Sequence, residues 1–257
     1  MVDKLKNSLP GIIVVVVIFA LWFLASGLQW VDSRFLPTPQ SVWDALVSIS
    51  TVGYKSGTLL EHLGASMERL FIALAIAIVL AVPLGLLSGR NKYVRSALNP
   101  IIEFYRPLPP LAYYALLVLW MGIENESKIM LLFLACFAPI YIACVAAVLK
   151  IPESYTTCAS TLGASSWQTF RLVVLPACLP DIFTGVRTAV GMGYSTLVAA
   201  EMVAATSGIG WMVLDASNWL RNDVIFAGII VMGITGIIID FVIRLIERKA
   251  VPWKGKE

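Results

Sequence analysis

Long apolar runs dominate this chain and limit it to folds that a lipid bilayer can hold. Apolar residues make up 59% of the sequence and charged residues only 14%, against roughly 45–50% and 25% in soluble domains. The hydrocarbon core of a bilayer is about 30 Å thick, so a helix needs about 20 mostly apolar residues to cross it. We predict an all-α membrane protein with six spans. They run approximately over residues 10–28, 60–87, 97–121, 127–148, 181–205 and 224–246.

The first apolar run shares one feature with a cleavable signal peptide, because Lys4 and Lys6 precede it. The stretch from Gly11 to Leu28 is long for such a peptide, and no clear small-x-small cleavage site follows it. We therefore expect a retained first helix, equivalent to a signal anchor.

Basic residues near the predicted span ends are distributed unevenly between the two sides of the membrane. With a cytoplasmic N-terminus, twelve lie on the inner flanks and four on the outer flanks, in agreement with the positive-inside rule. The inner ones are Lys4, Lys6, Arg90, Lys92, Arg95, Lys150, Arg171, Arg244, Arg248, Lys249, Lys254 and Lys256; the outer ones are Arg34, Lys55, Lys128 and Arg221. We expect both termini in the cytoplasm, and the net charge of +3 indicates orientation rather than nucleic-acid binding.

One membrane domain accounts for most of the chain. We expect residues 1–57 to hold the first span and an outer segment, residues 58–248 to form a compact five-span unit, and residues 249–257 to be a cytoplasmic tail. In the outer segment Pro37 and Pro39 resist helix formation, whereas Val42, Leu46 and Ile49 repeat at helical spacing. This pattern predicts a short amphipathic helix along the membrane surface.

The residues that usually bind metals are few and dispersed. Cys136 and Cys144 lie within an apolar run, Cys158 and Cys178 lie in a polar segment on the reducing cytoplasmic side, and no Cys-x-x-Cys pair occurs. His62 is the only histidine and sits at a span end, where packing is commoner than ligation or proton relay. We predict no metal site and assign His62 no role.

A polar segment from Lys150 to Pro180 interrupts the apolar pattern. Its hydroxyl, amide and charged side chains would carry a severe desolvation cost in hydrocarbon, so the segment is solvated or covered by protein. The pattern predicts a helix over 154–162 and a second over 166–174. Between them Gly163 would supply a positive φ or a close backbone approach. Leu175-Pro176 would then end the second helix.

This segment resembles the EAA loop of the permease subunits of ATP-binding-cassette (ABC) importers. In that loop a Glu-Ala-Ala triplet is followed by three residues, a glycine, nine residues and Ile-x-Leu-Pro. The corresponding residues here are Thr157, Cys158 and Ala159, then Gly163, and finally Val173 and Leu175-Pro176. The acidic residue of the triplet is missing, because Thr157 stands in its place, whereas the glycine of the corner is kept.

Six further motifs, in order along the chain, resemble the sulfonate, nitrate and bicarbonate branch of this family. They occupy residues 35–39, 105–112, 120–123, 127–129, 195–201 and 208–210. The Tyr-Arg-Pro-x-Pro-Pro-Leu-Ala run and the Ser-Thr-Leu-Val-Ala-Ala-Glu run are most similar to taurine permease-like members. The resemblance covers nearly the whole chain from Phe35 onward.

The resemblance implies a type I importer permease of the bacterial inner membrane that forms a homodimer. It also implies two ATP-binding subunits as partners and an external binding protein that delivers taurine or a related aliphatic sulfonate. Nitrate, bicarbonate or a pyrimidine precursor is the alternative cargo. Coupling to the ATPase is then assigned to Thr157, Cys158, Ala159, Leu162, Gly163, Ala164, Ser165, Leu175 and Pro176.

The chain lacks a G-x-x-x-x-G-K-[ST] phosphate loop. It cannot bind ATP by that route, so a separate subunit must supply the free energy. We therefore expect no enzymatic activity and no cofactor in this chain, with ATP and Mg used by the partner ATPase.

Two parts of the membrane domain are candidates for a substrate path or gate. Prolines 107, 109 and 110 must break the third span, because the 11 residues after them cover only about 16 Å of helix. Broken helices often mark transport sites. Glu103 and Arg106, at i and i+3 in the first half, could pair with each other or contact an anion.

Polar residues also interrupt the fifth span, namely Tyr194, Ser195, Thr196 and Glu201. Intramembrane ionisable groups usually face the bundle interior, so we expect Glu201 to hold a gate or to pair with Arg69 or Arg187. The hydroxyls of Ser195 and Thr196 would form hydrogen bonds with a passing solute or between packed helices.

Two sequence features near the ends of the last two spans predict an ion pair and a folded turn. Asp240 and Arg244, at i and i+4, predict a stabilising pair at the inner end of the sixth span. Gly208 and Gly210 permit a folded or re-entrant turn at the outer link, where Trp211 and Trp219 would meet the binding protein or anchor the interface.

Two other protein classes fit less well. An ion-coupled secondary transporter needs charged or ion-coordinating residues at mid-membrane, and few are present. An intramembrane enzyme needs a constellation such as Ser/His or His/Asp/Glu, which one histidine at a membrane edge cannot supply.

Overall fold

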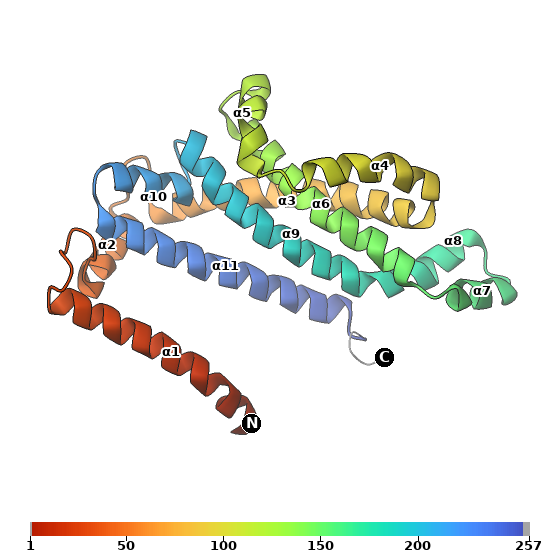
Figure 1. Cartoon of the computed structure of the whole chain (residues 1–257), viewed down its shortest axis with the longest axis horizontal. Helices are drawn as coiled ribbons and strands as arrows, with labels where there is room; N and C mark the ends of the chain where they lie inside the picture. Colours follow the sequence, from red (N-terminus) through yellow and green to blue (C-terminus); the bar gives the residue numbers. More distant parts are fainter. Residues whose placement is uncertain (1, 254–257) are drawn as a thin grey trace.

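The structure, a computed structural model that describes residues 2–253, is helical along most of that range and forms no strand within it (Figure 1). The helices are α1 (Val2–Gly27), α2 (Pro39–Thr51), α3 (Leu59–Arg90), α4 (Lys92–Tyr105), α5 (Pro110–Met121), α6 (Asn125–Lys150), α7 (Glu153–Thr161), α8 (Ser166–Thr169), the π-helical η1 (Phe170–Val174), α9 (Leu175–Ala204), α10 (Ile209–Asn218) and α11 (Asn222–Ala250). The prediction for residues 254–257, including Lys254 and Lys256, lies outside the described residues.

Four helices are long and apolar enough to cross a membrane: α3, α6, α11 and the continuous helical segment Ser166–Ala204. They run side by side along the long axis of the molecule (Figure 1), with α6 packed between α3 and α9. These helices confirm the second, fourth, fifth and sixth predicted spans. The fold class predicted from the sequence is therefore confirmed.

The predicted third span is broken, as the prolines required. The chain reverses at Asn91, whose side-chain oxygen accepts a hydrogen bond of 2.9 Å from the backbone N–H of Tyr93 and so caps α4. After the prolines, α5 stands out from the bundle (Figure 1). Tyr114 of α5 is buried and packs in one cluster with Leu131 and Ala200, so α6 and α9 hold this otherwise exposed helix.

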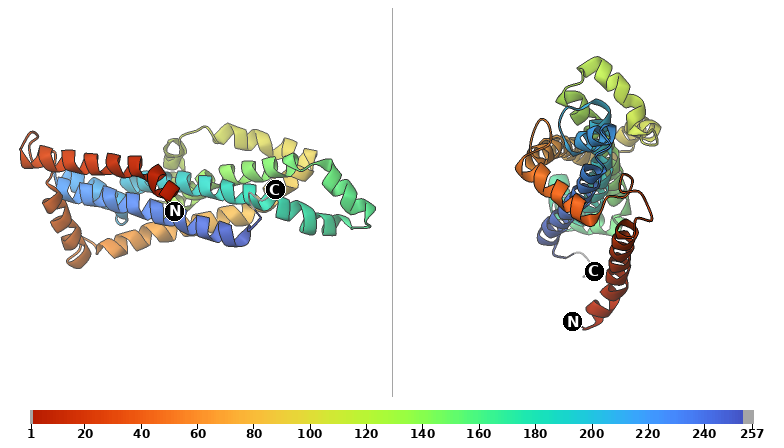
Figure 2. Two further views of the ribbon diagram at one scale, coloured as in Figure 1. Left: turned by 90° about the horizontal axis from the view of Figure 1, so that it is seen from below. Right: turned by 90° about the vertical axis from the view of Figure 1, so that its left-hand side faces the viewer.

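The first helix, α1, diverges from the rest of the molecule (Figure 2). Trp22 contacts the rest of the molecule, since its Nε1 donates to the backbone oxygen of Pro37 at 2.9 Å and its ring stacks on Phe226. Most other apolar side chains between residues 13 and 24 are exposed. A helix of this kind is stable only where lipid or another apolar surface covers it.

The predicted amphipathic helix is α2. Thr38 caps its first turn, with its hydroxyl accepting from the backbone N–H of Ser41 at 3.2 Å. Val42 and Ile49 are buried against α10 and α11, and Leu46 is partly buried. Both Figure 1 and Figure 2 show α2 crossing the ends of the long helices, which agrees with a position along the membrane surface.

Small residues let the three central helices approach closely, which is how packing is achieved where lipid removes the hydrophobic driving force. A Cβ on Gly85 of α3 would lie 2.5 Å from the Cβ of Cys144 in α6, and a Cβ on Gly185 of α9 would overlap with Ala143 of α6.

Valine at position 185 should therefore separate α6 from α9. We expect Gly185→Val to lower the thermal stability of the purified protein strongly, by about 1–3 kcal/mol or more, whereas Gly233→Val, where a Cβ has open space, should change it little. Equal melting temperatures for the two variants would contradict this packing.

Candidate functional site

The polar segment forms an exposed corner at the end of the bundle. Helix α7 ends in a Schellman motif, in which the N–H of Ala164 donates to the oxygen of Ala159 and the N–H of Gly163 donates to the oxygen of Ser160, both at 3.0 Å. This motif requires a left-handed residue, and Gly163 has φ +83°. A Cβ there would have no neighbour within 4 Å. The sequence predicted a glycine here for either a positive φ or a close backbone approach. Within this chain the positive φ is the reason.

A second helix starts directly after the corner. Ser165 caps α8 by accepting from the backbone N–H of Gln168 at 3.3 Å, and the Gln168 side chain accepts from the backbone N–H of Ser165 at 2.7 Å. This reciprocal capping box fixes the angle at which the new helix leaves the corner. Gln168 was missed in the sequence analysis, although the Ser-x-x-Gln spacing was a readable signal.

Leu175-Pro176 does not end the second helix, and that prediction is wrong. Residues 166–204 are continuously helical, because the chain forms one π-helical turn, η1, before the proline. In this turn the N–H of Leu175 donates to the oxygen of Phe170. The wider turn shifts the backbone hydrogen-bond register before Pro176, so the helix continues although Pro176 has no N–H to donate. The corner is consequently joined to the fifth span by an unbroken helix.

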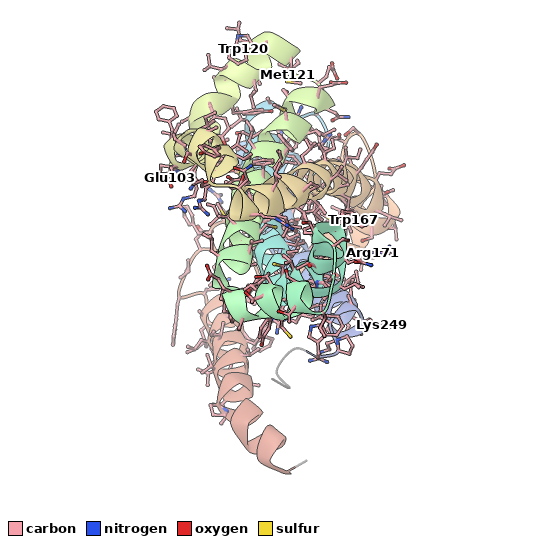
Figure 3. The ribbon with its side chains drawn as sticks, turned by 90° about the vertical axis from the view of Figure 1, so that its right-hand side faces the viewer. Glu103, Trp120, Met121, Trp167, Arg171 and Lys249 are labelled. Carbon is pink, nitrogen blue, oxygen red and sulfur yellow. The ribbon has the colours of Figure 1, made fainter. Side chains whose placement is uncertain are left out.

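The outer surface of the corner is polar with several exposed apolar side chains. Leu162 is 82% exposed, and Tyr155, Trp167 and Leu172 are each more than half exposed. Trp167 and Arg171 lie beside each other on this end of the molecule (Figure 3). In the triplet positions, Thr157 and Cys158 are exposed and Ala159 is partly buried.

A cavity of about 320 Å³ separates the corner from the bundle behind it. Arg90 at the end of α3, Thr156 of α7 and Val174 of η1 are among its lining residues. Helices α7 and α8 pack against each other and against η1, so the corner is joined to the bundle through η1 and through the short link between α6 and α7.

Glu103 and Arg106 do not pair, so that expectation is wrong. Both side chains are exposed at the end of α4, and no ion pair joins them among the described residues. Exposed ion pairs gain little over hydration, which explains why the i, i+3 spacing alone does not produce one. Both residues line a pocket of about 190 Å³, together with Asn99 and Tyr141.

The polar residues of the fifth span face different surroundings. The Tyr194 hydroxyl donates to the backbone oxygen of Met232 at 2.9 Å, which ties α9 to α11. Thr196 is buried, whereas Ser195 is exposed and its hydroxyl donates to the oxygen of Gly191 one turn earlier. Of these residues, Ser195 is the one with a hydroxyl on an open face of the span.

Glu201 pairs with Arg69, one of the two partners predicted. Arg69 Nη1 lies 2.7 Å from Glu201 Oε1, and the two side chains are 6% and 1% exposed. Ser66 donates to the same carboxylate at 2.7 Å, and the backbone N–H of Gly210 donates to it at 3.0 Å. Asn125 accepts from Arg69 Nε at 2.8 Å. Sequence analysis missed Ser66 and Asn125, because nothing local connects them to a glutamate so distant in the chain.

The loop between α9 and α10 folds back onto this ion pair, as the glycines predicted. Gly208 has φ +121°, and a Cβ on it would overlap with the carboxylate of Glu201. The N–H of Gly208 donates to His62 Nδ1 at 3.2 Å, so His62 Nε2 carries the proton that bonds the oxygen of Tyr54. His62 is thus a packed structural residue, and its ring lies against Trp211.

A second polar group holds α10 against the segment between α2 and α3. Asp215 accepts from the Tyr54 hydroxyl and from Lys55 Nζ, both at 2.8 Å. Burial of Asp215 on its own would raise its pKa, but these two donors hold the pKa below its usual value. Burial and the carboxylate together raise the pKa of Tyr54 to about 12, so the phenol remains a hydrogen-bond donor at physiological pH. Trp219 stays exposed beside Lys55.

The predicted pair between Asp240 and Arg244, near the C-terminal end of α11, is confirmed. Arg244 Nε lies 2.7 Å from Asp240 Oδ2, and Arg187 of α9 approaches the other oxygen of the same carboxylate at 3.1 Å. Arg187 therefore belongs to a cluster with Asp240 and Glu247 of α11, apart from the Arg69–Glu201 pair.

Comparison with known proteins identifies the family. Residues 81–251 match the family described as binding-protein-dependent transport system inner membrane component. The chain belongs to this family. The permease is therefore a multi-pass membrane protein of an ABC-type transport system, and its membership confirms the resemblance seen in the sequence.

Several relatives and one solved structure are similar along most of their length. The taurine transport system permease protein TauC of Escherichia coli is 42% identical over 93% of this chain and 88% of its own. The putative aliphatic sulfonates transport permease protein SsuC of Bacillus subtilis is 32% identical over 98% and 90%. The nitrate import permease protein NrtB of Leptolyngbya laminosa is 30% identical over 98% and 91%. The MetNI methionine ABC transporter in inward-facing conformations shares the fold, with a TM-score of 0.66, 19% identity, and coverage of 75% of this chain and 95% of that chain.

Proposed function

We propose that this chain is the permease subunit of an ATP-driven importer for taurine or related aliphatic sulfonates. It would work as a homodimer, with two ATPase subunits on the cytoplasmic side and an external binding protein that delivers the solute. We propose cytoplasmic N- and C-termini, a core membrane domain over residues 58–248, and use of ATP and Mg by the ATPase alone. The single observation that carries the mechanism is the exposed glycine corner that continues without a break into a spanning helix.

The corner supports docking of a separate ATPase. Its outer surface offers Leu162 and Trp167, apolar side chains that water-exposed loops rarely leave uncovered as a group. Thr157 in place of the acidic residue means that docking would depend on shape and apolar contact rather than on a charge at that position. Closure of the ATPases around ATP would push the corner, and η1 and α9 would carry this displacement into the membrane.

Alternating access follows if the long helices move as groups. The Arg69–Glu201 pair joins α3, α9 and the loop before α10, so these elements would move as one body. Glu201 is fully buried and its oxygens are occupied, so we assign it to this joint rather than to solute contact. We keep Glu103, Arg106 and Ser195 as candidates for the solute path, because they lie on open surfaces.

An ion-coupled secondary transporter is the rival class. Such a protein needs a buried charged group that exchanges its ion during transport. The strongest candidate for that role, Glu201, is already neutralised by Arg69 within hydrogen-bond distance. This arrangement favours external energy input through the corner.

The cargo is tested by reconstitution with the partner subunits. We expect taurine, presented by its binding protein, to stimulate ATP hydrolysis by the reconstituted complex several-fold, with the ligand-free binding protein as the control. Nitrate is the second candidate, because a nitrate import permease is 30% identical to this chain. Stimulation by nitrate with its binding protein, and none by taurine or an alkanesulfonate, would overturn the sulfonate assignment and retain the permease mechanism.

A further inference from the structure

A pocket of about 310 Å³ lies between the C-terminal end of α11 and the middle of α9, at Arg187. Its lining residues are Arg187, Arg244, Glu247, Arg248, Val251 and Pro252. Three guanidinium groups thus converge on one small space at the end of the last spanning helix.

The charges in this pocket do not cancel. Arg187 lies between Asp240, at 3.1 Å, and Glu247, at 3.9 Å, and Arg244 shares Asp240 with it. Arg248 is exposed and has no ion-pair partner among the described residues. Three arginines against two carboxylates leave one positive charge in excess, which favours an anion as occupant.

The donor groups suit a phosphate. Each guanidinium carries five N–H donors in a fixed fork, and two parallel bonds to one phosphate are a common arrangement. Arg244 uses its Nε for Asp240, and its two terminal nitrogens donate to none of the described residues. These nitrogens and the guanidinium of Arg248 remain available to a ligand in the pocket.

Apolar surface adjoins the pocket along α11. Phe241 is 64% exposed and Leu245 is about half exposed, and both lie next to the pocket-lining face of the helix. Trp253 follows directly after the pocket residues and is also exposed, as is typical of the headgroup level of a membrane. A free anion would use the arginines alone, whereas a lipid would use the arginines and this apolar strip together.

We propose that this pocket binds the phosphate of an anionic phospholipid, with its acyl chains along the exposed side of α11. Basic pockets between the cytoplasmic ends of spanning helices are suited to such headgroups. Placement in the inner leaflet rests on the proposed orientation of the permease, whereas binding itself does not. The lipid would bridge α11 and α9, the helix that leads to the corner.

Two neighbouring residues provide a matched test. Arg248 lines the pocket, and Lys249 is the next residue, exposed, of the same charge and outside the pocket lining (Figure 3). The permease copurified with its ATPase in detergent is titrated with phosphatidylglycerol, and bound lipid is counted by native mass spectrometry. Arg248→Gln should weaken the apparent affinity about fivefold, as expected for one lost basic contact. Lys249→Gln should leave it unchanged.

Three outcomes would overturn the lipid site. Equal losses in the two variants would indicate a general surface-charge effect, and no loss in either would show that the pocket is unused. Displacement of phosphatidylglycerol by inorganic phosphate, with binding of phosphate that Arg248→Gln abolishes, would indicate a site for a free oxyanion. The titration needs neither cargo nor uptake. A negative result would therefore overturn the lipid site and leave the proposed transport function unaffected.

Discussion

Valine at position 163 is expected to abolish most ATP-driven uptake while the membrane bundle remains folded. Gly163 has φ +83°, and the Schellman motif that ends α7 depends on that conformation. A left-handed conformation costs an ordinary residue about 1–2 kcal/mol, and a β-branched residue is a genuine outlier there. The corner would adopt another turn, and Leu162 would leave the position it has between α7 and α8.

The measurement combines uptake of labelled solute with copurification of the ATPase. We expect Gly163→Val to lower both by about tenfold or more, since 1.4 kcal/mol corresponds to a factor of ten. Asparagine tolerates the left-handed region, so Gly163→Asn should keep most of the activity. If Asn fails as completely as Val, the requirement is a close approach by the ATPase backbone, because a Cβ at this position meets nothing in the permease itself. A loss of bundle stability in Gly163→Val would contradict the local role assigned to the corner.

Local patterns in the sequence carried the prediction of this corner. Helix, glycine and helix are properties of adjacent residues, and the structure places α7 and α8 within a residue or two of their predicted starts. The prediction for Leu175-Pro176 was wrong because a proline ends a helix only if the chain cannot adjust its hydrogen-bond register. Here η1 makes that adjustment, supported by the burial of Val174 and Thr169 against the bundle.

Charged pairs illustrate what sequence spacing can and cannot determine. The cost of an isolated charge in the membrane predicted a basic partner for Glu201, but Arg69 and Arg187 were equally acceptable without a three-dimensional arrangement. The packing of α3 beside α9 decides between them, and Arg187 is taken up by Asp240 instead. For Glu103 and Arg106 the same spacing rule failed, because both groups stay exposed and hydrated.

Neutralising Glu201 is expected to destabilise the permease more than any other single charge change. The variant Glu201→Gln keeps the shape of the side chain but leaves Arg69 as a buried cation without a counter-ion. Removing one partner of a buried pair typically costs about 3–5 kcal/mol. The amide also cannot accept all the hydrogen bonds that Ser66, Arg69 and Gly210 now donate to the carboxylate.

The exposed pair on α11 provides the matched control. Asp240 is also an acid paired with arginines, but its side chain is 42% exposed. Exposed pairs contribute about 0–1 kcal/mol, so Asp240→Asn should lower the temperature of half-unfolding only slightly. Thermal unfolding of both purified variants in the same detergent makes the comparison direct, and similar small shifts would show that Arg69 and Glu201 are better hydrated than their burial indicates.

A double replacement separates the ion pair from the packing around it. Arg69→Met together with Glu201→Leu removes both charges and keeps apolar volume, and such replacements of buried pairs are often neutral for stability. We expect the double variant to recover part of the thermal stability that Glu201→Gln loses, because the uncompensated buried charge is gone while two buried donors still lack an acceptor. Uptake should not recover with it, because the backbone N–H of Gly210 and the Ser66 hydroxyl lose their acceptor and the loop before α10 is no longer attached to α3 through Arg69 and Ser207. Full recovery of both stability and uptake would show that the pair is a packing element that the transport cycle does not use.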